Sequence, residues 1–534
     1  MKLLRLLRTA RHVHPDQIRL KMMYALRKAK AERGKLQLSD PGTLSISPIK
    51  LKKYLSLQPS CHGGTFNFLN HSIAFSIDPD WNFKDYGALW TIRLNSFEYL
   101  YHPETTQKEG NFLMSSFARK AESNQLLYDS YCVSQRIMNW TSFLSRYESN
   151  DLEILSFLWK QAYYLSVNPE YYLKNNHLLD NGFALLRAGL FFGEERFFLA
   201  GQSILINELN KQLLNDGAHI ELSPMYHCSV LWRLLESIDA MQMVKQDYSP
   251  LNFLLRDAAS KMFGWLEAIV FANGELPSIN DSAIDGAPGL AALADYAHVL
   301  GIKCQHSTLG MSGLRKFKNR HFELLVDVNG FTQASAPGHA HADALHFILH
   351  VFGSAFIVDT GVSVYEKGPV RSYERSTAAH NTVEIGGKNQ SEIYGNFRVG
   401  RRARIVHLQE KGHMIEATHD GYKSSGAMHT RKFEFHDNEI VITDHIRQEG
   451  TSNGIAFLHV DKKCGLRLEN GRLFSKFVQV SFEGADHVEC SDSWYSPAFG
   501  IQLPAYKVKI PFSKGLVTRI SIGGTEDKEQ KSGQ

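Results

Sequence analysis

The spacing of apolar residues changes once along this chain of 534 residues, near residue 313. From about 111 to 310, apolar residues recur three and four positions apart, as in GFALLRAGLFF and VLWRLLESIDAM, which predicts consecutive amphipathic helices. From about 313 the chain alternates apolar and polar residues between Gly or Asn-Gly turns, as in FELLVDVNG and EIVITDHI. This alternation predicts an antiparallel β-domain, a sandwich. Two domains with separate cores are therefore expected.

The predicted organisation has four segments, which differ in composition. A basic amphipathic N-terminal segment covers residues 1–40, and a helical domain with an irregular leading segment covers 41–312. The β-domain covers 313–525, and the charged, apolar-free tail 526–534 is expected to be disordered.

Composition excludes several classes of protein. The balance of 59 basic and 55 acidic residues leaves a net charge of +4, too small to indicate nucleic-acid binding. The six cysteines lie far apart without a CxxC pair, which is typical of buried thiols and not of disulfide or zinc-knuckle frameworks. No window of about 18 uncharged apolar residues occurs, so no transmembrane helix is predicted.

The N-terminus alternates Leu with Arg and Lys and lacks the apolar stretch of a signal peptide. A cytoplasmic location is therefore expected, with the periplasm or cell envelope as the alternative. The same segment predicts either a solvated helix pair or a basic amphipathic helix at a membrane surface.

The segment NNHLLDNG, residues 175–182, precedes a long apolar run. On a helix His177 and Asn181 share a face, as do Asn176 and Asp180, so one turn would carry a small polar cluster. An ordinary capped helix start explains the same residues equally well.

The segment DGAHIELSPMYH places a tyrosine at the start of a helix. Ser223 is a natural N-cap and Pro224 fits the first helical position, so Tyr226 falls in the first turn. The helix dipole would favour a phenolate-like oxygen there and suit Tyr226 to proton transfer. Simple packing of the ring is the alternative.

The segment GHAHADALHFILHVFG is the most specific part of the sequence. Read as a strand, it directs His339, His341 and Asp343 to one face, which then continues as apolar core. Ionisable groups converging at the end of a buried strand need a reason, and metal coordination is one. Histidine nitrogen and aspartate oxygen donors suit zinc.

A loop-rich segment follows, residues 357–387, and it carries further polar side chains between strands. These are Asp359, Tyr365, Arg371, Tyr373, Arg375, His380 and Asn381. Arginines beside tyrosines indicate recognition of carboxylate or sulfate, because the guanidinium fork matches planar anions. A hairpin with surface arginines is the alternative.

Together these pieces resemble the heparinase II/III-like polysaccharide lyases. The matching motifs are NNHLLDNG, DGAHIELSPMYH, GHAHADALHF, FIVDTG and RSTAAHNTV, in this order over residues 175–383. The resemblance implies an incomplete (α/α) toroid followed by an antiparallel β-sandwich, with the substrate cleft between them.

The resemblance also implies roles for individual residues. Asn176 and His177 match an Asn-His pair of which one member contacts a uronate carboxylate, and Tyr226 and His339 match the catalytic tyrosine and histidine. One structural zinc is implied, with the ligands His341, Asp359 and His380. The substrate-binding candidates are Asp180, Tyr365, Arg371 and Arg375.

The reaction implied is β-elimination across C4–C5 of a uronic acid in an acidic polysaccharide, which gives an unsaturated product. A group that neutralises the carboxylate stabilises the developing charge, while a base removes the C5 proton and an acid protonates the leaving oxygen. The sequence does not decide which of Tyr226 and His339 is the base. A role in capsule or exopolysaccharide assembly follows only by analogy.

Three other classes remain open at this point. A toroid-type hydrolase would need two carboxylates flanking the bond, and no such pair stands out. A non-catalytic protein that binds acidic glycan during capsule or exopolysaccharide assembly would keep the same fold. A catalytic zinc that activates water is the third alternative.

Overall fold

The structure is a computed structural model, which describes residues 8–9, 11–34, 44–57, 61–76, 78–243, 249–331, 337–448 and 453–523. The predicted tail 526–534 lies outside the described residues, as do parts of the predicted segment 1–40.

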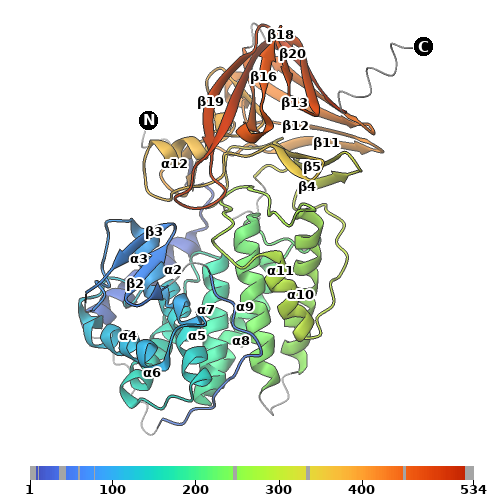
Figure 1. Cartoon of the computed structure of the whole chain (residues 1–534). Helices are drawn as coiled ribbons and strands as arrows, with labels where there is room; N and C mark the ends of the chain where they lie inside the picture. Colours follow the sequence, from blue (N-terminus) through green and yellow to red (C-terminus); the bar gives the residue numbers. More distant parts are fainter. Residues whose placement is uncertain are drawn as a thin grey trace.

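The first half of the chain is a layer of helices, as the apolar spacing predicted (Figure 1). The long helices are α2 (Pro15–Glu32), α3 (Ala88–Ser96), α4 (Gln107–Lys120), α5 (Ser130–Arg146), α6 (Leu152–Val167), α7 (Asn176–Phe192), α8 (Glu195–Gln212), α9 (Pro224–Gln242), α10 (Ser249–Ile269) and α11 (Leu290–Val299). Their apolar faces share one core, because the helices curve around a common apolar interior. Among the described helices, none combines the length and apolar character needed to cross a bilayer.

Local sequence fixes the two helix starts that matter for the site. Asn175 accepts a hydrogen bond from the backbone N–H of His177 and begins α7. Ser223 accepts one from the N–H of Tyr226 and begins α9, with Pro224 at the first helical position. Both caps satisfy backbone donors that a helix start leaves free. The predicted placement of Tyr226 in a first turn is confirmed.

The leading segment is more regular than the sequence predicted. Three short strands, β1 (Cys61–His62), β2 (Thr65–Phe68) and β3 (His71–Ala74), form a small antiparallel sheet. Phe66 and Phe68 are buried from this sheet, and their rings pack on Tyr99. Tertiary packing of these aromatic rings therefore orders a stretch whose Gly and Ser residues read as loop.

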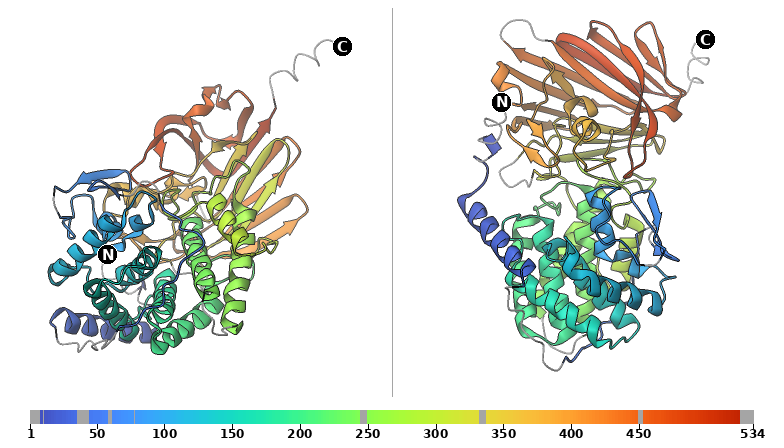
Figure 2. Two further views of the ribbon diagram at one scale, coloured as in Figure 1. Left: turned by 60° about the horizontal axis from the view of Figure 1, so that its bottom comes forward. Right: turned by 90° about the vertical axis from the view of Figure 1, so that its left-hand side faces the viewer.

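The second half is one antiparallel sheet with 15 strands among the described residues, curled so that its inner face closes on an apolar core (Figures 1 and 2). The strands are β4 (Leu314–Lys318), β5 (Phe322–Asp327), β6 (Phe347–Val351), β7 (Ser354–Ile357), β8 (Val383–Ile385), β11 (Ile405–Lys411), β12 (Met414–His419), β13 (Ala427–Phe435), β14 (Glu439–Gln448), β15 (Gly454–Asp461), β16 (Arg467–Glu469), β17 (Arg472–Phe474), β18 (Val478–Ala485), β19 (Glu489–Tyr495) and β20 (Leu503–Ile522). A separate pair, β9 (Ile393–Tyr394) and β10 (Arg398–Val399), and the short helix α12 (Pro369–Glu374) lie in its long loops.

Strand β20 joins the layers of the curled sheet. Its first half pairs with β15 and β19, and its second half pairs with β14 and β18. Alternate side chains of β20 are buried, as period-two alternation requires. The predicted sandwich is thus two layers of one continuous sheet.

The two halves meet through both apolar and polar contacts. One apolar cluster contains Trp265 and Phe271 from the helical half together with Leu325 and Ile348 from the sheet. The loop 277–286, between α10 and α11, adds backbone bonds to the sheet half: the Asp281 N–H donates to the His339 carbonyl over 3.1 Å. The loop therefore holds residues of both halves in register.

The prediction of a strand over His339 to Phe347 is wrong for most of its length. Strand β6 begins only at Phe347, and residues 339–346 form a looped approach to it. Leu345 has a φ of 62°, in the left-handed region, and it lies in a turn directly before the strand. The faces of His339, His341 and His346 consequently do not follow strand alternation.

Candidate active site

Tyr226 and His339 come together across the joint between the two halves. Tyr226 lies in the first turn of α9, and its ring centroid is 4.1 Å from that of His339, which precedes β6. The Tyr226 hydroxyl is 3.2 Å from the hydroxyl of Tyr365, from the loop after β7. The ring of Phe397, which is 40% exposed, covers His339 at 5.6 Å. The site thus contains Tyr226 from the helical half together with Tyr365 and His339 from the sheet half.

The structure reverses the electrostatic effect predicted for Tyr226. Burial raises the pKa of Tyr226, and the hydrogen bond with Tyr365 only partly opposes this. The helix start does not overcome the loss of water around the phenol. Tyr226 is therefore a neutral hydroxyl at ordinary pH and not the phenolate-like group that the helix dipole suggested.

Asp281 organises this site, and the sequence had not pointed to it. Its Oδ2 lies 2.9 Å from His339 Nδ1, and its Oδ1 lies 2.9 Å from His341 Nε2. Arg371 donates to both oxygens, at 2.5 and 2.7 Å. Burial alone would raise the pKa of Asp281, but Arg371 and the two histidines hold the pKa well below its usual range. Asp281 is therefore a buried carboxylate with four donors.

The tautomer of His339 follows from this contact. An ionised carboxylate only accepts hydrogen bonds, so the proton of the neutral His339 ring lies on Nδ1. Its Nε2 keeps a lone pair and lies 4.0 Å from a carboxylate oxygen of Glu221. The arrangement leaves His339 able to accept a proton at Nε2.

The predicted substrate-binding residues Arg371 and Arg375 do not lie on an open surface. Both side chains are buried, with exposures of 1% and 0%. Arg371 donates hydrogen bonds to the Asp281 carboxylate, while Arg375 donates to the backbone carbonyls of Asn396 and Ala340. Their guanidinium groups hold loops and a carboxylate in place and do not face an open surface.

A second group of polar residues lies at the start of α7. His177 Nδ1 is 3.3 Å from Glu170 Oε1, and the Oδ1 atom of Asn176 is buried without a hydrogen-bond partner in the described residues. Burial alone would lower the pKa of His177, but the Glu170 carboxylate outweighs it and raises the pKa to about 9. Burial raises the pKa of nearby Asp180 to about 7. His177 is thus an imidazolium at neutral pH.

Tyr131 of α5 links this group to the first one. Its ring centroid is 4.5 Å from that of His177, and Tyr226 contributes to the raised pKa of its phenol. Both His177 and His339 lower the pKa of Glu221, which burial raises. The side chains predicted as Asn-His pair, tyrosine and histidine therefore belong to one electrostatic neighbourhood.

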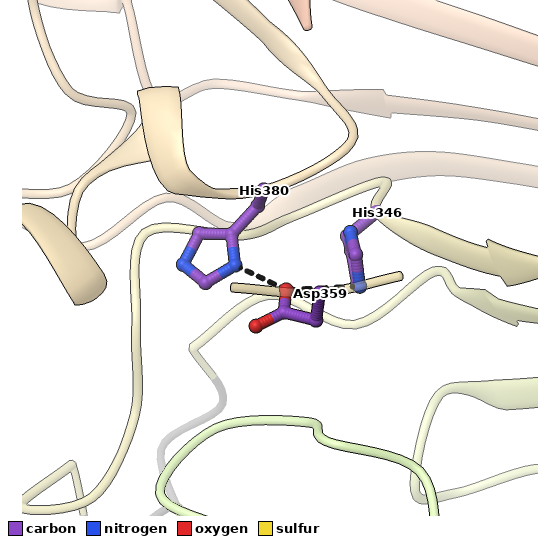
Figure 3. A group of neighbouring side chains, drawn as sticks. All are labelled: His346, Asp359 and His380. Atoms are coloured by element: carbon purple, nitrogen blue, oxygen red, sulfur yellow. Dashed lines mark hydrogen bonds and ion pairs between the residues drawn. The ribbon is translucent and has the colours of Figure 1, made fainter. Parts of the chain in front are cut away.

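A cluster of potential metal ligands lies in the sheet half (Figure 3). Ligand atoms of His346, Asp359 and His380 all lie within 4.8 Å of one another, and these residues form the one such group in the described part of the chain. His380 Nδ1 lies 2.6 Å and His346 Nε2 lies 3.2 Å from Asp359 Oδ2. The predicted ligand His341 is outside the group, although its ring is 5.2 Å from that of His380.

Hydrogen bonds decide which rings can donate a lone pair. His346 Nδ1 accepts the backbone N–H of Asn381, so its neutral ring carries the proton on Nε2 and has no lone pair there. His341 gives its Nε2 proton to Asp281, and its Nδ1 is buried without a partner in the described residues. His380 donates from Nδ1 to Asp359. Its Nε2 is likewise buried without a partner in the described residues.

The donor set fits a divalent cation. Three buried carboxylates raise the pKa of His380, although burial alone would lower it: those of Asp359, Asp343 and Asp327. Buried carboxylates around one imidazole call for a cation, and two free ring nitrogens with an aspartate are typical zinc ligands. His341, Asp359 and His380 therefore fit the metal by their proton positions. His346 Nε2 lies 3.2 Å from the same carboxylate without forming a hydrogen bond, and because it carries the ring proton it offers the metal no lone pair.

Sequence reasoning missed three residues that shape the site. Asp281 lies in PSINDSAIDG, an apparently ordinary loop, and Glu170 lies in VNPEYY. His346 follows the HAHAD motif but falls on the opposite face of the strand that we had predicted. Only the last carried a signal, because its histidine sits within the densest histidine stretch.

Comparison with known proteins matches both halves of the chain. A model described as "Heparinase II/III N-terminus" matches residues 108–300, and one described as "Heparinase II/III-like, C-terminal" matches residues 305–528.

Two relatives share part of their length with this chain. A heparin-sulfate lyase of Pedobacter heparinus is 26% identical over 359 residues, which are 58% of this chain and 53% of the relative. A heparin-sulfate lyase of Bacteroides stercoris is 24% identical over 384 residues, 65% of this chain and 52% of the relative. The chain thus spans about half the length of these relatives.

A solved structure shares the fold over almost the whole chain. The crystal structure of heparinase III superimposes with a TM-score of 0.68 at 17% identity, covering 96% of this chain and 93% of that one. The incomplete (α/α) toroid followed by an antiparallel β-sandwich is thereby confirmed. Both matched halves and this shared fold place the chain in the heparinase II/III-like family.

Proposed function

We propose that this protein is a polysaccharide lyase that cleaves a uronic-acid-containing glycan by β-elimination. The observation that carries the proposal is the pairing of a neutral tyrosine hydroxyl with an imidazole whose tautomer is fixed. Tyr226 and His339 lie ring to ring at 4.1 Å, and Asp281 holds His339 with its Nε2 free. Elimination needs one proton acceptor and one proton donor on the two sides of a C–C bond.

Recognition of the sugar acid is assigned to the start of α7. His177 carries a positive charge at neutral pH because Glu170 supports its imidazolium form. A cation beside the uronate carboxylate lowers the cost of removing the C5 proton, since it stabilises the enolate-like charge that forms. Asn176 lies at the same helix start, and its unpartnered amide oxygen, which only accepts hydrogen bonds, suits a sugar hydroxyl beside that carboxylate.

The proton transfers follow from the protonation states. His339 takes the C5 proton on Nε2, because Nδ1 already donates to Asp281. Tyr226 gives its proton to the departing glycosidic oxygen, and the neighbouring Tyr365 hydroxyl, 3.2 Å away, supports the transient phenolate. Each transfer typically contributes about 10²–10⁴-fold in rate.

We further propose one zinc ion with a structural role, held by His341, Asp359 and His380. When bound, the metal would neutralise the buried carboxylates around His380 and fix the loop that carries His339. His341 connects this site to the reaction centre, because its Nε2 shares Asp281 with His339.

The substrate class is proposed from chemistry and from the relatives together. An imidazolium suits a carboxylate, and both relatives are heparin-sulfate lyases. A glycosaminoglycan-like acidic polysaccharide is therefore the substrate that we propose.

A second partner is an anionic lipid surface at α2. The face of α2 opposite the protein exposes Ile18, Met22 and Leu26, at 51%, 62% and 63%. The other face packs through Tyr24, whose ring is 5.0 Å from that of Tyr172. Exposed apolar residues at helical spacing, flanked by Arg and Lys, are typical of helices that lie in a membrane interface.

Removal of either proton-transfer group separates the two roles. Tyr226→Phe and His339→Gln should each lower turnover of an acidic polysaccharide, followed by the ultraviolet absorbance of the new C=C bond, by about 10²–10⁴-fold. A uronide with a 2,4-dinitrophenolate leaving group at C4 needs no acid, so it should restore turnover by Tyr226→Phe but not by His339→Gln. Rescue of His339→Gln alone would reverse the two roles.

The pH profile tests the charge of His177. Because the pKa of His177 is raised to about 9, the imidazolium is present below that pH, and kcat/KM should fall as the pH rises through it. Glu170→Gln removes the charge that raises the pKa, so this alkaline limb should move to lower pH. The exposed Glu195→Gln serves as the control. A limb that stays in place in Glu170→Gln would contradict the assignment.

Metal analysis distinguishes the two candidate histidines. The purified protein should contain about one zinc per chain, and His341→Gln and His380→Gln should lose it. His346→Gln should retain it, because His346 offers no lone pair at Nε2. Loss of zinc in His346→Gln with retention in His341→Gln would show that the proton positions were misjudged.

Vesicle sedimentation tests the lipid contact. The protein should pellet with phosphatidylcholine vesicles that contain phosphatidylglycerol, less so at high salt, and Ile18→Ser/Leu26→Ser should remain in the supernatant. Phe253→Ser, an exposed apolar residue on α10, is the matched control. Equal pelleting of both variants would remove α2 from the interaction.

A further inference from the structure

A basic hollow lies between the N-terminal segment and the sheet half. Its volume is about 410 Å³, and its wall includes Arg11, His12, Arg401, Arg402 and Arg404. The N-terminal segment is fastened to this loop, since Arg8 forms a 3.0 Å ion pair with Glu392. Figure 2 shows this segment running from the side of the sheet half down along the helical half.

The positive charge of the hollow is only partly balanced within the described part of the chain, where Glu392 pairs with Arg8 and also interacts with Arg401. No carboxylate there lies within ion-pair distance of the guanidinium groups of Arg11, Arg401, Arg402 and Arg404. The one carboxylate in the wall, Asp420, accepts the backbone N–H of Arg404. By contrast, buried arginines of the described chain such as Arg233, Arg371 and Arg431 are paired with a carboxylate.

Partial burial makes this imbalance costly. The Nε atoms of Arg401 and Arg402 are buried without a partner in the described residues. Burial lowers the pKa of Arg402, and Arg404 lowers it further. Burial, Arg402 and Arg404 together lower the pKa of His12. Cations that are partly removed from water and repel one another are stabilised when an anion binds.

The hollow is close to the reaction centre along the chain. Phe397 contacts His339 and Tyr365, with ring centroids 5.6 and 5.2 Å apart. Arg402 is only five positions after Phe397, and five extended residues span at most about 18 Å. A short oligosaccharide held at Tyr226 and His339 could therefore extend as far as the hollow.

We infer that the basic hollow is a distal subsite that binds a carboxylate or sulfate group of the same acidic polysaccharide, several sugars from the bond that is cleaved. This inference rests on the proposed lyase function. Guanidinium groups suit both anions, because their planar N–H donors match pairs of acceptor oxygens. A lipid phosphate has similar chemistry, but Arg401 and Arg402 follow Phe397 closely in sequence and Phe397 contacts His339, whereas the apolar face of α2 offers lipid contact separately.

The test compares oligosaccharides of two lengths in the Tyr226→Phe protein, where cleavage does not interfere. Fluorescent tetrasaccharides and octasaccharides of heparan sulfate, chondroitin sulfate and alginate are the probes. Arg11→Gln/Arg404→Gln, both exposed positions, should weaken binding of the preferred octasaccharide about fivefold, the effect of losing two ion pairs. Its tetrasaccharide should bind as before. Arg467→Gln/Arg472→Gln removes the same charge from exposed sites on β16 and β17 and should change neither.

The outcomes separate this inference from the proposed function. If the Tyr226→Phe protein binds octasaccharide but the Arg11→Gln/Arg404→Gln change has no effect, or affects both lengths equally, the distal subsite is wrong and the lyase proposal stands. If none of the probes binds at either length, both are wrong. Loss of phosphatidylglycerol-vesicle binding with full retention of octasaccharide binding would assign the hollow to lipid phosphate. Thermal unfolding of each variant checks that it is folded.

Discussion

The active-site arrangement depends on one buried carboxylate, Asp281. Each of its oxygens accepts two donors: Oδ1 from His341 and Arg371, and Oδ2 from His339 and Arg371. Taking such a charge out of water is costly unless hydrogen-bond donors compensate it fully. All four donors come from the sheet half, whereas Asp281 belongs to a loop of the helical half. The contact therefore fixes the position of one half against the other as well as the orientation of the rings.

The orientation of two histidines follows from that single contact. His339 is left with a free Nε2 next to Tyr226, and His341 is left with a free Nδ1 next to His380. The two oxygens of Asp281 thus orient both rings: Oδ2 orients the proposed proton acceptor His339, and Oδ1 orients the proposed metal ligand His341. The helical half contributes the complementary chemistry, a neutral phenol at the start of α9 and an imidazolium at the start of α7. Neither half holds a complete site.

Features encoded locally could be predicted from the sequence, whereas features that depend on distant contacts could not. The caps Asn175 and Ser223 act on the next two or three residues, so the helix starts with His177 and Tyr226 were placed correctly. The change of apolar period likewise located the two halves. Asp281 gave no signal, because its partners lie 58 to 90 residues away in sequence.

Errors arose where tertiary structure overrides a local pattern. The turn at Leu345 delays the start of the expected strand to Phe347, and His346, between them, lies 3.2 Å from Asp359. Arg371 and Arg375 read as surface anion-binding residues, but burial commits them to Asp281 and to backbone carbonyls. The phenol of Tyr226 showed the same effect, since burial outweighed the helix dipole.

The most direct test of the lyase assignment is the mass of the products formed from a uronic-acid polysaccharide in ¹⁸O-labelled water. Elimination involves no water, so the account predicts that each cleavage gives a non-reducing end lighter by one water than a hydrolysis product, with no label introduced by the cleavage itself. Products of full hydrolytic mass that carry one ¹⁸O per cleaved bond would contradict it.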